Sequence, residues 1–182
     1  MRWLCLDPGE KRTGVAVSSP EGTFAIPLVV LEHDQDGPTP GLVCGLLEEH
    51  RADGLVIGLP LNMDGTMSSR TMAVVRLARH LAACFGAALE TPDGLAMPEE
   101  DGGLADGPVS GAGGTAPRIV LWDERLTSWA AQRMRDGGEP ERRRKGGKKR
   151  PLDAHAAAVI LQSYLDAQPW WSGAAGSELP ED

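Results

Sequence analysis

The sequence predicts one α/β domain built on a mixed sheet of five strands with flanking helices, and three observations lead to this prediction. A hairpin opens the chain, because two strand-like segments flank the turn residues 20–22. The wholly apolar segment 54–59 is typical of a buried parallel strand. Strand and helix patterns then alternate along the chain, which is typical of α/β domains.

Each predicted element rests on apolar spacing and on turn residues at its ends. The five predicted strands are residues 2–6, 13–18, 23–31, 54–59 and 118–122. Helices are predicted at 42–51, 68–85, 127–135 and 153–168. Ser68 or Ser69 is the expected cap of the second helix, and Pro169 is expected to follow the last one.

Composition divides the chain into a folded part and two further segments. Residues 1–168 are predicted to form the domain, interrupted by an insertion at 92–117. The insertion has seven glycines, four prolines, five acidic residues and no Lys or Arg, a composition typical of a flexible surface segment. Residues 169–182 are predicted to form a disordered tail.

The charge distribution points to one polyanion-binding region. The net charge of −8 argues against a general nucleic-acid binder. Residues 118–151 nevertheless hold eleven basic and five acidic side chains, which favours a local contact with a polyanion. The alternative is a solvated charge run without a partner.

Targeting features are missing from the sequence. No apolar run is long enough to span a membrane, and the first residues lack the charged and apolar regions of a signal peptide. The three cysteines have no paired spacing and are expected to be reduced, buried thiols. We therefore expect a cytoplasmic protein with no membrane partner.

Acidic residues stand at the ends of three predicted elements. Asp7 ends the first strand, Asp123 and Glu124 end the fifth, and Asp153 opens the last helix. Carboxylates gathered at one site repel one another unless cations neutralise them, and Mg²⁺ or Mn²⁺ held in this way can promote phosphodiester cleavage. The four histidines show no comparable pattern, so a histidine-based metal site is not expected.

Each acid also has an ordinary structural explanation. Asp7 could belong to an Asp-Pro-Gly turn, Asp153 could only cap a helix, and Glu124 could pair with Arg125 or Arg12. Asp123 and Glu124 cannot both face one point on a continuous strand, because neighbouring side chains alternate. Periodicity does not decide which of the two is the ligand.

Four sequence blocks stand out in a fixed order, namely LDPGEKRTGVAV at 6–17, VIGLPLNMDGT at 56–66, DERLTS at 123–128 and DAHAAAVILQSYL at 153–165. Together they resemble the YqgF family, RuvX-like Holliday junction resolvases that are also assigned as nucleases of precursor 16S ribosomal RNA. The resemblance covers nearly everything outside the insertion and the tail. It implies an RNase H-like fold and cleavage of phosphodiesters with a divalent metal ion.

The resemblance also implies roles for individual residues. It places Asp7, Glu124 and Asp153 at the catalytic, metal-binding positions, and so favours Glu124 over Asp123. A loop containing Asn62 and Asp64 is expected to border the site. The residues expected to contact nucleic acid are Lys11, Arg12 and Arg125, together with Arg143, Arg144, Lys148 and Lys149 of the basic segment.

The expected function is metal-dependent processing of the 5′ end of precursor 16S ribosomal RNA. The alternatives are resolution of four-way DNA junctions and a non-catalytic nucleic-acid-binding module. An actin-like ATPase is disfavoured because it would need two duplicated domains, and this chain has room for one. The sequence leaves open whether the protein is a monomer or a homodimer.

Overall fold

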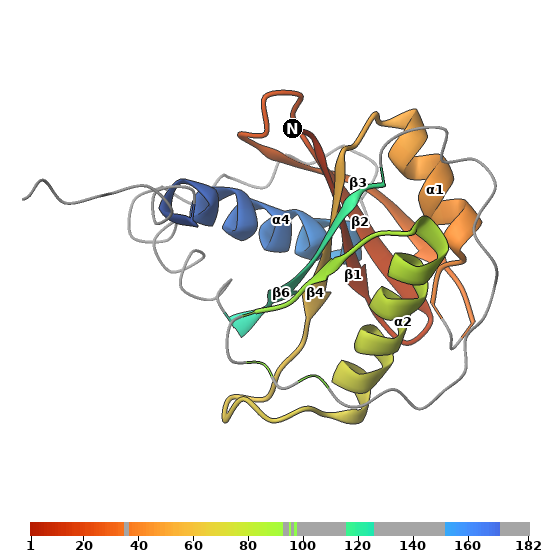
Figure 1. The fold of residues 1–182 in the computed structure, drawn as a ribbon, viewed down its shortest axis with the longest axis vertical. Coiled ribbons are helices and arrows are strands. Elements are labelled where there is room, and N and C mark those ends of the chain that lie inside the picture. Colours follow the sequence, from red (N-terminus) through yellow and green to blue (C-terminus); the bar gives the residue numbers. More distant parts are fainter. Residues whose placement is uncertain (35–36, 93–94, 96, 98–115, 126–151, 172–182) are drawn as a thin grey trace, which may run out of the picture.

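A six-stranded mixed sheet forms the centre of the molecule in the computed structural model, which describes residues 1–34, 37–92, 95, 97, 116–125 and 152–171 (Figure 1). The strands are β1 (Trp3–Pro8), β2 (Arg12–Ser18), β3 (Ala25–Glu32), β4 (Gly54–Leu59), β5 (Leu89–Glu90) and β6 (Arg118–Asp123). Their order is β3-β2-β1-β4-β6-β5. Strands β1 to β3 are antiparallel neighbours, and the β1–β4, β4–β6 and β5–β6 pairs are parallel.

The predicted mixed α/β architecture is confirmed, but the predicted number of strands is wrong. The sixth strand, β5, has two residues, Leu89 and Glu90, which pair with Ile119 and Val120 of β6. A strand of this length is too short to produce a recognisable alternation. The first strand also extends to Pro8, so that Asp7 lies within the strand and not after it.

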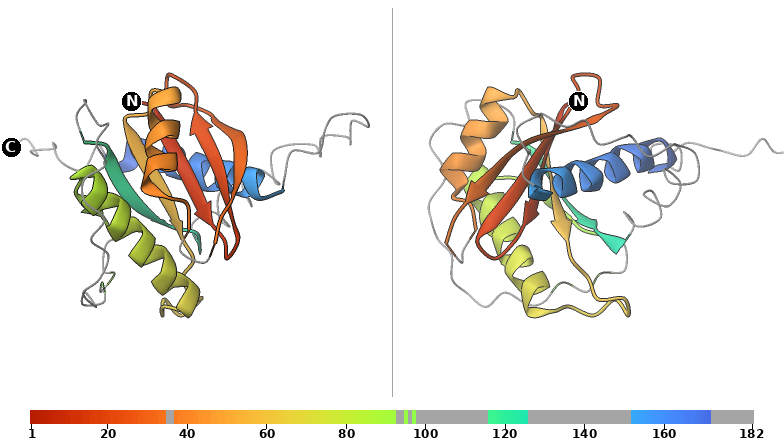
Figure 2. Two further views of the ribbon diagram at one scale, coloured as in Figure 1. Left: turned by 90° about the vertical axis from the view of Figure 1, so that its right-hand side faces the viewer. Right: turned by 180° about the vertical axis from the view of Figure 1, so that it is seen from behind.

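Helices cover both faces of the sheet. Helices α1 (Pro40–Glu49) and α2 (Ser69–Phe85) lie on one face, and α4 (Leu152–Trp171) crosses the other (Figures 1 and 2). Ser68 caps α2 in a reciprocal pair with Thr71, as predicted. Helix α4 continues past Pro169, because a proline near a helix end removes one hydrogen bond and need not end the helix. The predicted helix at 127–135 lies outside the described residues.

The two faces of the sheet bury different residues of each strand. On the α1 and α2 face, the core includes Leu4, Leu6, Ile57, Ile119 and Leu121. On the α4 face, the core is made by Trp3, Cys5, Ala16, Val56 and Val120, together with Ala157, Ile160, Leu161, Tyr164 and Leu165 of the helix. This alternation fixes the side of the sheet to which every strand residue points.

Aromatic and polar contacts hold α4 on the sheet. The ring of Tyr164 stands edge-on to Trp3 and Trp122, with centroids 4.8 and 5.3 Å apart. The indole of Trp122 donates a 2.7 Å hydrogen bond to Ser163 Oγ. The side chain of Gln162 accepts a hydrogen bond from the backbone N–H of Ala25 at 2.9 Å. These contacts fix the second half of the helix on the sheet.

The beginning of the predicted insertion packs on the domain. Leu95 and Met97 are partly buried against the α1 and α2 core, so these two residues do not belong to a freely solvated segment. The described helices include none that is long and apolar enough to cross a membrane. The three cysteines are free and buried, as predicted.

Gly14 allows the closest approach between α4 and the sheet, and this approach can be tested. A Cβ atom on Gly14 would lie 2.1 Å from the carbonyl oxygen of Asp153, which is backbone and cannot move aside alone. We expect Gly14→Ala to lower the free energy of unfolding by about 1–3 kcal/mol. Gly45→Ala is the control, since Gly45 has open space around its Cβ position and lies within α1, where alanine is favoured. Equal melting temperatures of the two variants would contradict this role of Gly14.

Candidate active site

Strand alternation brings Asp7 and Glu124 to the same face of the sheet. Trp3 and Cys5 of β1 face α4, and Asp7 continues this series. Glu124 follows the last residue of β6. Its carboxylate and the side chain of Ile160 of α4 both lie close to the position that a Cβ atom of Gly58 would take. Asp123 belongs to the opposite series, with Ile119 and Leu121. The two acids at the end of β6 therefore point to different faces.

Asp153 reaches this region from the first turn of α4. The contact of its backbone with Gly14 places it over β2, next to β1. Its carboxylate lies 3.4 Å from Nε of Arg12, the first residue of β2. Three elements distant in sequence thus supply the three acids that were expected to act together.

Gly58 leaves room for the carboxylate of Glu124 on the sheet, on strand β4 between β1 and β6. It follows Ile57, the register partner of Leu6, on β4. A Cβ atom here would lie 2.8 Å from Oε1 of Glu124 and 2.9 Å from Cδ1 of Ile160. A glycine inside a strand commonly marks such a close approach.

The carboxylates influence one another electrostatically. Burial is the main cause that raises the pKa of Asp7; Arg70 opposes the shift and Asp153 adds to it. Burial likewise raises the pKa of Glu124 to about 7, with repulsion from Asp7 as the next cause and Arg70 opposing it. The site therefore concentrates negative charge in a partly dehydrated place, where a cation would be stabilised.

The donor set suits a hard divalent cation. All three side chains offer carboxylate oxygens, which are preferred by Mg²⁺ and Mn²⁺. Cys5 lies beneath them, but burial, followed by repulsion from Asp7 and Glu124, raises the pKa of its thiol and keeps it protonated. Within the described ranges, no three His, Cys, Asp or Glu side chains are arranged closely enough to hold an ion as they stand. Metal binding would need the carboxylates to draw together.

Two arginines sit against these acids. Arg12 pairs with Asp153, and Nη2 of Arg70 lies 4.0 Å from Oδ1 of Asp7. Both guanidinium groups are more than half exposed, so their pairing with the carboxylates is weakly held in water. A divalent cation can therefore displace Arg12 from Asp153, or Arg70 from Asp7, at little energetic cost.

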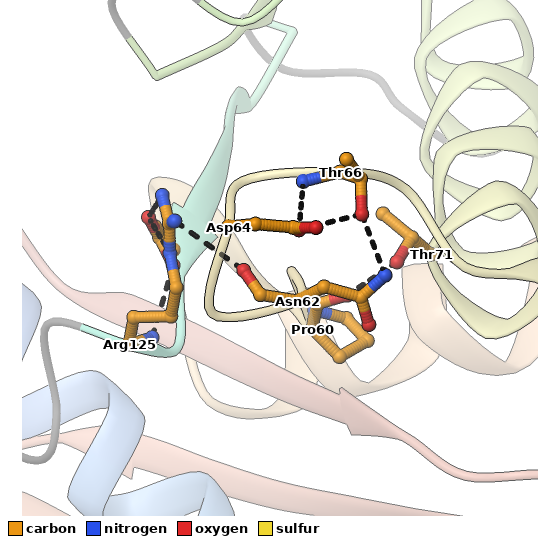
Figure 3. Close-up of polar contacts among 7 residues, drawn as sticks. Pro60, Asn62, Asp64, Thr66, Thr71 and Arg125 are labelled. Carbon is orange, nitrogen blue, oxygen red and sulfur yellow. Dashed lines mark hydrogen bonds and ion pairs between the residues drawn. The ribbon is translucent and has the colours of Figure 1, made fainter.

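Asp123 has a structural role on the opposite face. Its carboxylate is 8% exposed and accepts hydrogen bonds from both Nε and Nη2 of Arg125, the latter at 2.6 Å. Nη1 of Arg125 also donates to the carbonyl oxygen of Asn62 at 3.4 Å (Figure 3). Arg125 thus ties the end of β6 to the loop 60–67 and has less freedom than a dedicated phosphate ligand would have.

The loop 60–67 is held by its own side chains. Asp64 accepts hydrogen bonds from the backbone N–H and the hydroxyl of Thr66, and Asn62 donates to the same hydroxyl (Figure 3). The hydroxyl of Thr71 on α2 donates to the carbonyl of Pro60. Asn62 and Asp64 therefore shape the loop, and their side chains are engaged within it.

The predicted site residues are placed as follows. Asp7, Glu124 and Asp153 are brought to one side of the sheet, and Lys11 and Arg12 are exposed nearby. Arg143, Arg144, Lys148 and Lys149 lie outside the described residues, so their role stays a prediction. Sequence reasoning missed Gly14, Gly58 and Arg70; the two glycines inside strand patterns were the available signal for the first two.

Comparisons with known proteins identify similar chains. The sequence model of the family described as RuvX, Holliday junction resolvase, matches residues 1–94 and 112–167. A Geobacillus kaustophilus (strain HTA426) protein named "Putative pre-16S rRNA nuclease" is 34% identical over 92% of this chain and 99% of its own length. A protein of the same name from Thermoanaerobacter pseudethanolicus is 31% identical over 92% of this chain and 98% of its own.

Among solved structures, this chain is similar to "T. thermophilus RuvC in complex with Holliday junction substrate". The TM-score is 0.48 and the sequence identity 13%, with 93% of this chain and 96% of that chain covered. The family match leaves out residues 95–111, which lie within the segment whose composition predicts an insertion.

The burial of Glu124 predicts a pH-dependent cost in stability. Its raised pKa means that the ionised form destabilises the fold, a penalty that is complete above about pH 7 and disappears below about pH 4.5. In chelator at pH 8, we expect Glu124→Gln to raise the melting temperature by about 2–4 °C, the effect of roughly 1 kcal/mol in a domain of this size.

This gain should shrink as the pH falls from 8 towards 5. Glu21→Gln, at an exposed turn residue, is the control and should change little at any pH. A variant at Glu124 that is less stable than the original protein at pH 8 would contradict the electrostatic account of the site.

Proposed function

The chain belongs to the RuvX family of Holliday junction resolvases, as its four sequence blocks predicted, and is a phosphodiester-cleaving nuclease. We propose that it has the RNase H-like fold that the family resemblance implies, and that Asp7, Glu124 and Asp153 hold its divalent metal ion. The observation that carries this proposal is the placement of the three acids on the α4 face, where burial, and then repulsion from the 15% exposed Asp7, raise the pKa of Glu124. Mg²⁺ is the preferred ion and Mn²⁺ the alternative, because the donors are carboxylate oxygens.

The residues of the chain divide the work of cleavage. Asp7, Glu124 and Asp153 would hold a divalent cation, which would supply charge stabilisation to the phosphoryl oxygens and activation of the attacking water. The sheet and α4 hold the carboxylates and limit the access of water to Glu124. Arg12 and Lys11, at the beginning of β2 and just before it, are exposed and can attract the phosphates on either side of the scissile bond.

The proposed substrate is the 5′ end of precursor 16S ribosomal RNA. The names of the relatives support this choice, whereas the family description supports four-way DNA as the second candidate. Among the described residues near the site, Trp122 and Tyr164 pack against each other between the sheet and α4 and are not free to stack on bases, which favours recognition of either substrate through its backbone. Incubation of both substrates with the protein and Mg²⁺, followed by mapping of the cut ends, separates the candidates.

Substitution of the carboxylates tests the assignment. Asp7→Asn, Glu124→Gln and Asp153→Asn should each reduce cleavage more than about 100-fold, the upper range for loss of a residue that only supports a metal ligand. Asp123→Asn should reduce it about tenfold or less, since Asp123 acts through Arg125. Melting temperatures should be measured alongside. An active Glu124→Gln with an inactive, folded Asp123→Asn would reverse the assignment.

Removal of the metal ion tests the reaction class. Cleavage should stop in excess chelator and return when Mg²⁺ or Mn²⁺ is added, because the carboxylates alone cannot stabilise the charge of the transition state. Zn²⁺ should be a poorer replacement at this oxygen-only donor set. Undiminished cleavage in chelator would contradict the proposal, and binding without any cleavage would indicate the non-catalytic module.

A further inference from the structure

A cavity lies beside the site, between the β1–β2 turn and the first half of α2. Its volume is about 440 Å³. The turn contributes residues 8–11, Gly37 lies at one side, and α2 contributes the rest of the wall, namely Ser69, Arg70, Ala73, Val74, Arg76 and Leu77. We call this cavity the α2 pocket.

Three cations and one acid line the α2 pocket. Lys11, Arg70 and Arg76 are all exposed, and Glu10 is the single carboxylate. Lys11 and Arg76 have no ion-pair partner in the part of the chain that the structure describes. Such side chains gathered in a concave surface favour an anionic ligand.

Arg70 connects the α2 pocket to the carboxylates. Its Nη2 donates a 3.3 Å hydrogen bond to the carbonyl oxygen of Pro8 and lies 4.0 Å from Oδ1 of Asp7. Asp7 points to the α4 face, whereas α2 lies on the other, so Arg70 reaches around the end of β1. A chain of phosphates that passed the carboxylates could therefore continue directly into the pocket.

The lining also indicates which part of a nucleic acid it would contact. It contains no aromatic side chain on which a base could stack, and its apolar members Val74 and Leu77 are buried. Cationic side chains without an aromatic platform are typical of contacts to phosphates and sugars. A site for a free nucleotide would also need groups that bind the base.

We propose that the α2 pocket binds the sugar–phosphate backbone of the substrate next to the scissile phosphate, through Lys11, Arg70 and Arg76. This inference rests on the proposed nuclease function. Arg12 faces Asp153 on the α4 side. Cations on both faces of the sheet, at the end where the carboxylates lie, therefore contact the substrate. The ligand chemistry is the phosphodiester backbone, which RNA and DNA share.

Binding of fluorescein-labelled 20-base-pair duplexes, one of RNA and one of DNA, tests the inference in chelator, where the duplexes stay intact. Arg76→Gln and the double variant Lys11→Gln/Arg76→Gln should weaken binding roughly three- to tenfold for each cation removed. The slope of log affinity against log salt should flatten by about 0.9 for each lost phosphate contact. A loss with RNA alone, with DNA alone or with both identifies which backbone the pocket holds.

Arg51→Gln is the matched control. Arg51 is an exposed arginine that precedes β4, at the opposite end of this strand from the site. Its replacement by Gln removes the same single positive charge as Arg76→Gln. We expect its affinity and salt slope to remain those of the original protein. Equal weakening by Arg51→Gln and Arg76→Gln would overturn the inference, because it would show an effect of net charge alone.

The failure of this inference differs from the failure of the proposed function. Unchanged affinity and salt slope in the folded double variant would overturn the proposed binding of the backbone in the α2 pocket. Metal-dependent cleavage by the original protein would still support the nuclease function. If the original protein neither binds nor cleaves either duplex or the mapped substrates, the proposed function itself is wrong. Tight binding of a free mononucleotide, lost in Arg76→Gln, would also overturn the backbone assignment.

Discussion

Repulsion between Asp7 and Glu124, half-buried under α4, is the interaction on which the rest of the site depends. The two charges repel each other, yet β1 and β6 present both side chains to the same face of the sheet. Gly58 leaves the space that Glu124 occupies, and Gly14 lets Asp153 of α4 approach the sheet. Holding these carboxylates close together therefore lowers the stability of the fold, a cost that is common at functional sites.

The surrounding cations reconcile an acidic protein with a polyanionic substrate. The net charge of −8 repels nucleic acid at long range, so binding must come from local clusters. Within the described structure, the positive charge that we propose to bind the substrate comes from Arg12 on the α4 side and from the α2 pocket on the other. The basic segment 118–151 is a third candidate for contact with the substrate, and it is recognised from the charges in its sequence alone. Salt and divalent ions should therefore act on separate steps, binding and cleavage.

The sequence was sufficient for the fold class, and its local patterns indicated the three acids, whose metal-binding role is a proposal. It could not choose between Asp123 and Glu124 by periodicity, since β6 is apolar on both faces and either series could have faced α4. The family resemblance made the choice, and the packing of Val120 against α4 supplies its physical reason. Arg70 could not be found, because its contacts join positions 62 residues apart. Strand β5 was missed because it has two residues.

The proposed function requires that Asp7, Glu124 and Asp153 together bind a divalent ion. A crystal structure of the protein grown with Mn²⁺, with anomalous differences measured near the manganese absorption edge, tests this requirement. We expect an anomalous peak in contact with oxygen atoms of Asp7, Glu124 and Asp153, with Arg12 moved away from Asp153. An ordered site with no peak there, or a peak held by Asp123 instead, would contradict the proposed function.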